Sequence, residues 1–348
     1  MRVLSKAGSR RVGMMVIAVA IGASVTAAPA MPEFTPAPPA HARVGPSPNV
    51  GKCVNLANTL EPPNEGDWGG AFHDEDARII RDAGFATVRV PVNFLGHAMA
   101  KPPYMLDRTF MARARHVIDT LREAGLNVIV DQHNNDDLSA APEQNRERSA
   151  AVWRQVAAAL RDEPANVWFE LLNEPHGKLT NANLLATLTP SLAAIRVTNP
   201  KRVVVIGGQN WSGVDSLATL PMPNDPYVVP TFHYYDPFEF THQGATFVHP
   251  APPFGRTFGG SADVPQLQDS LAKIRAFEAR TGRVPFVGEY GAIETIPLRQ
   301  RTLYYHTVTS AFASMGLASC AWGYRNAFPL WKDGRWLPGL VEAIAAPK

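Results

Sequence analysis

Two glutamates of this 348-residue sequence each follow a short apolar run. Glu174 comes after residues 167–172, with Asn173 directly before it, and Glu289 comes after residues 285–288. A carboxylate at the end of a buried strand is costly in free energy unless that end opens into a site. Two carboxyl groups that face one glycosidic bond can supply a proton to the leaving oxygen and a partner for the reacting carbon. The pair therefore has the chemistry for cleaving a glycoside.

Polar and aromatic residues also stand at the ends of the other apolar runs. These side chains can bind hydroxyl groups, hold a carboxylate in place or stack on a flat ring. In chain order the predicted substrate-binding residues are Asn55, Arg89, His133, Asn173, Trp211, His233, Tyr235 and Trp322.

The elements that must position these residues alternate between strands and helices, the pattern of a parallel sheet with helical crossovers. Strands are predicted at about residues 52–56, 86–90, 127–130, 167–172, 202–206, 227–232, 285–288 and 317–321, and helices at about 74–83, 107–124, 145–161, 183–197, 264–280 and 297–314. Eight strands predict an α/β fold with a single domain, the (β/α)8 TIM barrel. Catalytic groups of such barrels lie at the C-terminal strand ends. Glu174 on the fourth strand and Glu289 on the seventh would face each other there.

Several of these residues also have a purely structural interpretation. Glu170 lies inside a strand rather than at its end, so we interpret it as a structural residue of the barrel. Arg89 could be an ion-pairing strand residue, and His133 and His233 could be hydrogen-bonded core histidines. A metal site built from Asp131 and the two histidines has no supporting spacing such as His-Glu-x-x-His, so no metal is predicted.

The motifs resemble those of glycoside hydrolase family 5, the cellulase family. The resemblance covers about residues 51–336, and it is carried by residues 51–61, 87–91 and 131–134, by Asn173-Glu174-Pro175, by His233-Tyr234-Tyr235, by residues 287–291 and by Trp322. It implies that Glu174 is the general acid/base and Glu289 the nucleophile of a retaining mechanism. Asn173 would then bind the sugar 2-hydroxyl, Arg89 and Tyr235 would keep Glu289 ionised, and Trp322 would stack on a sugar ring. Apolar walls and the charge of Glu289 are expected to raise the pKa of Glu174.

Residues 61–69 and 237–244 resemble loops of bacterial endo-β-1,4-glucanases, some of which also accept β-mannan. We therefore expect a monomeric endo-β-1,4-glucanase without a cofactor, whose partner is a polysaccharide, β-1,4-glucan with β-mannan left open. β-Mannanase, xyloglucanase, lichenase and exo-glucosidase activities remain alternatives, because the cleft loops decide between them. A non-catalytic carbohydrate-binding barrel and a metal-dependent barrel hydrolase are alternatives of other classes.

The first 48 residues predict export. Residues 1–30 have a basic start, an apolar segment at 12–25 and the small-residue site Ala28-Pro29-Ala30, which together indicate a signal peptide. Residues 31–48 are rich in proline and are expected to be a linker, and residues 49–348 the catalytic domain. A second cleavage site at 40–42, an uncleaved anchor and twin-arginine export remain alternatives. The expected location is secreted or periplasmic.

The net charge of the chain argues against nucleic acid and anionic membranes as partners. The formal net charge is +2, and outside residues 1–42 the acidic residues outnumber the basic ones by one. Such a balance gives no electrostatic footprint for nucleic acid or, once the signal is removed, for an anionic membrane. The charge balance is compatible with a neutral polymer as the binding partner.

The two cysteines, Cys53 and Cys320, fall on the first and last predicted strands, which are neighbours in a closed barrel. A disulfide there would fit an oxidising compartment. Two buried free thiols are the favoured interpretation, because pairing across adjacent strands demands special geometry.

Overall fold

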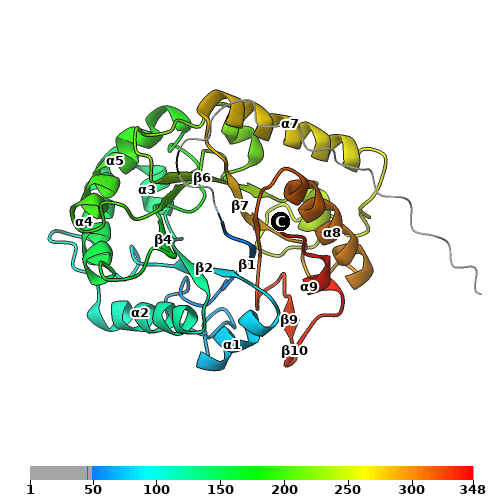
Figure 1. The fold of residues 1–348 in the computed structure, drawn as a ribbon, viewed down its shortest axis with the longest axis horizontal. Helices are drawn as coiled ribbons and strands as arrows, with labels where there is room; N and C mark the ends of the chain where they lie inside the picture. The colour runs from blue at the N-terminus through cyan, green and yellow to red at the C-terminus, as the bar shows by residue number, and fades with distance from the viewer. Residues whose placement is uncertain (1–44, 46–48, 348) are drawn as a thin grey trace, which may run out of the picture. The chain divides into compact units, whose positions relative to one another are not determined.

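Eight parallel strands close into a barrel in the order β1 to β8, with helices around it (Figure 1). The structure is a computed structural model that describes residues 45 and 49–347. The strands are β1 (Lys52–Asn55), β2 (Thr87–Val92), β3 (Asn127–Gln132), β4 (Val167–Glu170), β5 (Val204–Ile206), β6 (Val228–Tyr234), β7 (Phe286–Tyr290) and β8 (Ser319–Ala321). The predicted (β/α)8 barrel is confirmed. The predicted signal peptide and nearly all of the predicted linker lie outside the described residues.

All six predicted helices are present. They are α1 (Asp74–Asp82), α2 (Arg108–Glu123), α4 (Pro142–Ala159), α5 (Asn181–Thr198), α7 (Asp263–Thr281) and α8 (Leu298–Ser314). The sequence analysis missed α3 (Asp136–Ala140), α6 (Phe238–Thr241), α9 (Leu340–Ala343) and the 3-10 helix η1 (Val214–Ala218). Each of these spans only one turn or slightly more, which is too short for a helical period to show in the sequence. In the described residues no helix has the length and apolar character that crossing a membrane requires.

Local signals explain where the elements begin and end. Asp107 caps α2 by accepting a hydrogen bond from the Phe110 amide at 2.8 Å. α7 ends at Gly282, whose φ of 67° is the left-handed conformation that glycine adopts most easily. Every residue of β2 and β6 is buried, as expected for parallel strands that are covered on both faces.

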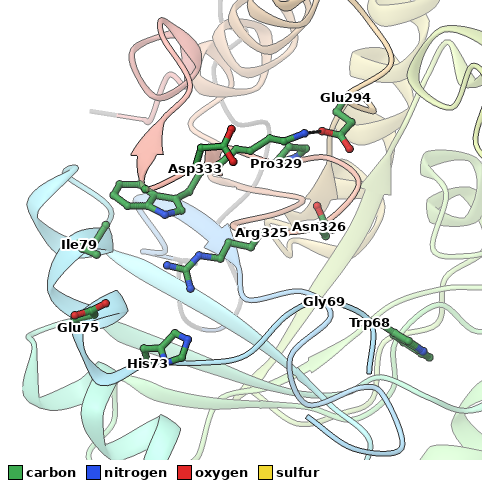
Figure 2. A pocket seen from close by; sticks show the side chains of 13 residues that line it. Trp68, Gly69, His73, Glu75, Ile79, Glu294, Arg325, Asn326, Pro329 and Asp333 are labelled. Atoms are coloured by element: carbon green, nitrogen blue, oxygen red, sulfur yellow. Dashed lines mark hydrogen bonds and ion pairs between the residues drawn. The ribbon is translucent and has the colours of Figure 1, made fainter. Parts of the chain in front are cut away.

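A hairpin follows the barrel. β9 (Trp331–Lys332) and β10 (Arg335–Trp336) pair in antiparallel orientation. Trp331 and Lys332 border a surface pocket whose other residues include Glu75 and Ile79 of α1 (Figure 2). The hairpin and the first helix thus border the same pocket.

A compact apolar cluster comes from residues of the barrel strands and from Val50 and Ala318, which come just before β1 and β8. It consists of Val50, Cys53, Ile129, Val205, Val229, Phe286, Ala318 and Cys320. Two residues further along their strands, and therefore on the same face, stand the buried polar residues Asn55 after Cys53 and Asp131 after Ile129. The barrel is thus apolar in one layer and polar in the next layer toward the C-terminal strand ends.

Cys53 and Cys320 form a disulfide between β1 and β8. The favoured prediction of two free thiols is wrong. The two residues are direct partners in the β1–β8 register, which brings their Cα atoms to 4.2 Å. The bridge therefore links the first and last strands where the barrel closes.

Removal of this disulfide is expected to destabilise the fold. The bridge joins residues 267 positions apart, so we expect the double variant Cys53→Ala with Cys320→Ala to lower the free energy of unfolding by about 2–5 kcal/mol. Urea unfolding followed by circular dichroism measures this change. Wild-type protein unfolded with reductant is the control and should shift by a similar amount. If the urea midpoints of the double variant and of the reduced wild type were both unchanged, strand pairing alone would be enough to keep the barrel closed.

Candidate active site

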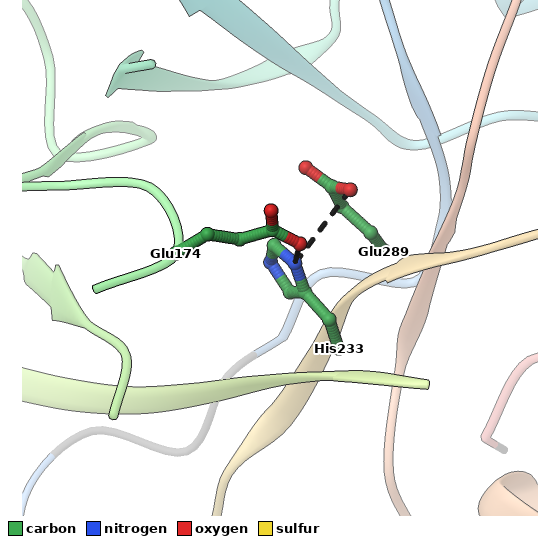
Figure 3. A group of neighbouring side chains, drawn as sticks. All are labelled: Glu174, His233 and Glu289. Atoms are coloured by element: carbon green, nitrogen blue, oxygen red, sulfur yellow. Dashed lines mark hydrogen bonds and ion pairs between the residues drawn. The ribbon is translucent and has the colours of Figure 1, made fainter. Parts of the chain in front are cut away.

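Glu174 and Glu289 meet at the mouth of the barrel (Figure 3). One carboxylate oxygen of each, and one ring nitrogen of His233, all lie within 4.8 Å of one another. Glu174 follows β4, Glu289 is on β7 and His233 is on β6. The two carboxylates that the sequence singled out are therefore brought together from distant strands.

The turn after β4 holds Glu174 in an uncommon backbone conformation. Its φ is 45°, in the left-handed region that costs free energy for a residue with a side chain. The Trp153 indole donates to the Leu171 carbonyl at 3.1 Å, and Asn135 donates to the Asn173 carbonyl. His176 Nδ1 lies 2.8 Å from the carbonyl of Glu174 itself. These contacts impose the turn that directs the carboxylate toward Glu289.

Glu289 is held by hydrogen bonds at both oxygens. Oε1 accepts from Arg89 Nη1 at 2.7 Å, and Oε2 accepts from the Tyr235 hydroxyl at 2.9 Å. His233 is its register partner on β6, directly after an irregularity in the strand pairing. Such irregularities re-aim side chains next to active sites.

Arg89 connects most of the polar residues beneath the mouth. Its guanidinium bonds Glu170 at 2.7 and 2.9 Å, Glu289 at 2.7 Å, Asn173 at 2.9 Å, Asn55 at 3.0 Å and Asp131 at 3.0 Å. Burial disfavours its charge, but the three carboxylates outweigh that effect and raise the pKa of Arg89 well above its ordinary value. Glu170 is buried and paired here, which agrees with its interpretation as a structural residue.

Two of the predicted substrate-binding residues prove to be inaccessible. Asn55 and Arg89 are each 0% exposed. The Asn55 amide donates to the Gly288 carbonyl at 3.1 Å, and its Oδ1 accepts from Arg89. Direct contact of either residue with a substrate is therefore a wrong prediction. Their polar atoms are needed to satisfy buried carboxylates and carbonyls below the site.

His133 carries a positive charge near the pair. Burial opposes that charge, but the hydrogen bond from Nδ1 to Asp131 at 2.7 Å, with the charges of Asp131, Glu61 and Glu289, raises the pKa of His133 to about 9. Its Nε2 lies 3.4 Å from Asn173 Nδ2. Its ring is stacked on Trp322 with centroids 5.4 Å apart. At neutral pH this histidine is an imidazolium at the edge of the cleft.

The pKa values of Glu174 and His233 are shifted in opposite directions, and burial is the main cause of both shifts. Burial raises the pKa of Glu174 to about 7, and Asp131 adds to the rise while His133, Arg89 and His176 oppose it. Burial lowers the pKa of His233 to about 4, against the negative charges of Glu289 and Glu170. His233 Nδ1 lies 2.7 Å from Glu174 Oε1, so a neutral ring contacts this carboxyl group. Glu174 keeps 24% of its side chain exposed and can be reached from the cleft.

A pocket of about 390 Å³, named here the inner pocket, opens beside the pair. Its lining consists of Asn58, Glu61, Trp68, His133, Phe247, Trp322, Asn326, Ala327 and Phe328. Glu61 is only 1% exposed and accepts backbone hydrogen bonds from Asn58 at 2.7 Å and Thr59 at 2.8 Å. Burial raises the pKa of Glu61, although His133 and these amides oppose the rise. The sequence analysis included Glu61 only as part of a loop motif.

Trp211 stands on the other side of the mouth, after β5. Its side chain is 59% exposed, and its ring is stacked with His176 at 5.5 Å with 5° between the planes. Its backbone amide donates to the Pro175 carbonyl at 3.1 Å. His176 was missed by the sequence analysis, although its position two residues after Glu174 is a usable signal. Asp131, weighed only as a metal ligand, likewise stands two residues before His133 and so shares its strand face.

Glu174, His233 and Glu289 are also close enough together to hold a metal ion by distance alone. Their atoms already contact one another and the Arg89 and Tyr235 donors. Asp131, His133 and His233, the trio weighed from the sequence, do not form such a group among the described residues. That the protein needs no metal remains a prediction.

Residues 51–327 match the family model described as cellulase, glycosyl hydrolase family 5. The chain belongs to this cellulase family. The predicted resemblance is therefore confirmed over most of the barrel.

Known members of the cellulase family share both sequence and fold with this chain. Endoglucanase H of Acetivibrio thermocellus is 31% identical over 273 residues, which is 78% of this chain and 29% of the relative. Cel5A of Thermotoga maritima, solved in complex with mannotriose, is 34% identical with a TM-score of 0.82, covering 85% of this chain and 97% of that one. A solved hyperthermophilic endo-β-1,4-glucanase in complex with substrate is 32% identical with a TM-score of 0.82, covering 84% and 96%. The chain spans less than a third of the length of endoglucanase H.

Among the ion pairs of the structure, those of Arg89 should contribute most to the free energy of unfolding. We expect Arg89→Ala to lower the free energy of unfolding by about 3–5 kcal/mol, because it leaves buried carboxylates without their cation. The matched control is Arg81→Ala, which removes a pair with Asp82 in which both side chains are about half exposed. That change should be below about 1 kcal/mol. Urea unfolding at neutral pH compares the two. Equal, small losses would show that Arg89 does not hold the cluster together.

Proposed function

We propose that this member of the cellulase family is a retaining endo-β-1,4-glucanase with Glu174 as general acid/base and Glu289 as nucleophile. The observation that carries the proposal is the approach of the two carboxylates, with an oxygen of each within 4.8 Å of the other. Retaining glycosidases hold their carboxyl groups about 5–5.5 Å apart, whereas inverting enzymes leave about 6.5–9.5 Å for a water molecule. The short separation favours direct attack by Glu289.

The proposed reaction has two steps. In the first, protonated Glu174 gives its proton to the glycosidic oxygen while a Glu289 oxygen bonds to the anomeric carbon, and the leaving sugar departs with that proton. In the second, the Glu174 carboxylate takes a proton from water, whose oxygen attacks the same carbon and breaks the bond to Glu289. The two inversions restore the starting configuration.

The surrounding residues support these roles in different ways. Arg89 and Tyr235 fix both oxygens of Glu289, which keeps the attacking atom in one position. Glu174 has its pKa raised to about 7, so a large fraction carries the needed proton near neutral pH. His233 contacts Glu174 as a neutral ring and so avoids stabilising the ionised form through an ion pair.

The polar residues at the cleft favour a neutral sugar chain. Asn173 is proposed to bind the sugar 2-hydroxyl, and Trp322 to stack on the ring that occupies the inner pocket. Trp211 would stack on the part of the polysaccharide that leaves, on the β5 side of the cleft. β-1,4-Glucan is the proposed substrate. Action on β-mannan is a second candidate, because a relative with the same fold was solved with mannotriose.

We further propose that the protein is exported, to the periplasm or the medium, and acts as a monomer. The Cys53–Cys320 disulfide supports export, because such bridges persist in oxidising compartments. The predicted signal peptide supports it independently.

Hydrolysis of soluble polysaccharides tests the substrate and the nucleophile together. We expect residues 43–348 to release reducing sugar from β-glucan and carboxymethylcellulose, and Glu289→Ala to lower turnover by roughly 10⁴-fold, because it removes the attacking group. Xyloglucan and galactomannan complete the panel. Chelator-treated enzyme should keep its activity.

Near-normal activity of Glu289→Ala would contradict the nucleophile assignment. Loss of activity in chelator, restored by metal, would favour a metal-dependent hydrolase. A folded wild-type protein that is inactive on the whole panel would favour a carbohydrate-binding barrel.

The pH dependence tests the acid. Because Glu174 must be protonated for the first step, kcat/KM should fall as pH rises through about 7, the raised pKa of this group. Glu174→Gln should lose this alkaline limb on a dinitrophenyl cellobioside, whose leaving group needs no proton, while its activity on β-glucan should nearly disappear. An alkaline limb that stays near pH 7 in Glu174→Gln would assign the titration to another group.

A further inference from the structure

His176 follows the Glu174 turn by two residues and has no role in the proposed reaction. Its Nδ1 lies 2.8 Å from the backbone carbonyl oxygen of Glu174. A carbonyl oxygen can only accept a hydrogen bond, so Nδ1 carries the proton and donates it. The side chain of His176 is 25% exposed, so water only partly competes for this bond. The imidazole therefore holds the backbone of the residue whose carboxyl group faces Glu289.

The backbone of Glu174 needs such support. Its φ of 45° is unfavourable for a residue with a side chain, and it persists only where the surroundings impose it. If the Glu174 carbonyl lost its donor, the turn could relax toward an ordinary conformation, and the carboxyl group would move with it. A displacement of about 1 Å of a reacting group is enough to lower a rate strongly.

The His176 ring is held in turn by Trp211. The two rings are stacked with centroids 5.5 Å apart and 5° between their planes. On the other nitrogen of the ring, Nε2 lies 3.6 Å from Asp136, but that carboxylate is fully exposed and water screens the pair. The indole is thus the stronger support, and the imidazole lies in contact with both Trp211 and the Glu174 carbonyl.

Trp211 belongs to a turn that is itself tied to the acid. Asn210, Trp211 and Ser212 are three consecutive left-handed residues, with φ of 55°, 54° and 55°. The Ser212 carbonyl accepts a hydrogen bond from the His233 amide at 2.8 Å. The ring of the same His233 contacts the Glu174 carboxyl group (Figure 3). One turn therefore reaches Glu174 twice, at its carboxyl group through His233 and at its backbone through His176.

We propose that His176 is a positioning residue for the general acid, whose Nδ1–H fixes the Glu174 backbone and whose stacked ring links Glu174 to Trp211 on the leaving side of the cleft. This inference rests on the proposed function and adds a residue to it. His176 is not a catalytic residue, because it acts through the backbone carbonyl and not on the reacting atoms. The residue that would stack on the leaving sugar and the residue that would protonate it are thus parts of one connected unit.

Cellobiosides with different phenol leaving groups test this role. The 2,4-dinitrophenyl, 4-nitrophenyl and phenyl compounds all place one aromatic ring on the leaving side, but their departure depends increasingly on a proton. We define the proton-dependence ratio as kcat/KM for phenyl cellobioside divided by kcat/KM for the dinitrophenyl compound. This ratio reports the placement of the acid, because the amount of active protein and the binding of the shared cellobiosyl unit cancel.

Two substitutions of His176 separate its hydrogen bond from its ring. His176→Phe keeps a flat ring beside Trp211 but removes the donor, so the proton-dependence ratio should fall about tenfold, which corresponds to about 1.4 kcal/mol. Its kcat/KM on the dinitrophenyl compound should stay within about twofold of the wild-type value, because that leaving group needs no proton. His176→Asn keeps an N–H donor in place of Nδ1 but loses the ring, so its ratio should fall by no more than about threefold.

Substitution of Trp211 tests the link between the two rings. Trp211→Ala should also lower the proton-dependence ratio by about threefold, because the donor remains but its ring loses support. The double variant of His176→Asn with Trp211→Ala should match the single variants, since each of them already removes the same stacked pair.

His97→Phe is the matched control. It makes the same substitution in another stacked histidine, whose ring lies 3.6 Å from that of Phe110, and it should leave the ratio unchanged. Glu174→Gln marks the ratio without an acid. Circular dichroism and the urea midpoint confirm that each variant is folded.

A wild-type ratio in His176→Phe, beside a large fall in Glu174→Gln, would overturn this inference and leave the proposed function intact. Equal falls in His176→Phe and His176→Asn would also overturn it, because the donated hydrogen bond could not then be the cause. Additive losses in the double variant would contradict the link to Trp211. A wild-type ratio in Glu174→Gln, or no hydrolysis of any of the three compounds, would overturn the proposed function and this inference with it.

Discussion

The arrangement of this barrel depends on one buried cation. Arg89 is completely enclosed and touches Asp131, Glu170 and Glu289, which come from three other strands. Charges removed from water are tolerated only when they are paired and hydrogen-bonded. The guanidinium therefore requires these strands to place their carboxylates at the same level along the barrel axis. It also holds Glu289 in the position from which this carboxylate faces the cleft.

The layers above and below Arg89 follow from this requirement. An apolar cluster that includes the Cys53–Cys320 bridge fills the barrel on the side away from the strand ends. On the other side, polar groups can reach the cleft because the strands end there. The left-handed backbone of Glu174 and the irregular pairing before His233 lie at this boundary. These two departures from regular geometry thus lie at the level where the carboxylates must be aimed.

Identical residue types acquire different properties within this small region. Glu174 lies in a partly buried position where its pKa rises to about 7, whereas both oxygens of Glu289 receive hydrogen bonds from Arg89 and Tyr235. His133 has its pKa raised to about 9 by Asp131, and His233 has its pKa lowered to about 4 by burial. The difference in each pair comes from the partners and the depth of burial, so one type of side chain can have two different chemical environments within one site.

The sequence by itself determined the barrel and the meeting of Glu174 with Glu289, because strand periodicity and the polar residues at strand ends are local properties that a parallel barrel converts into one site. It also marked Glu170 as structural from its place inside a strand. Only the tertiary structure decided that Asn55 and Arg89 lie beneath the cleft, that Cys53 is bonded to Cys320, and that His176 stacks on Trp211. The burial of single polar side chains and the register between strands arise from contacts between segments far apart in the chain, so no local pattern in the sequence specifies them.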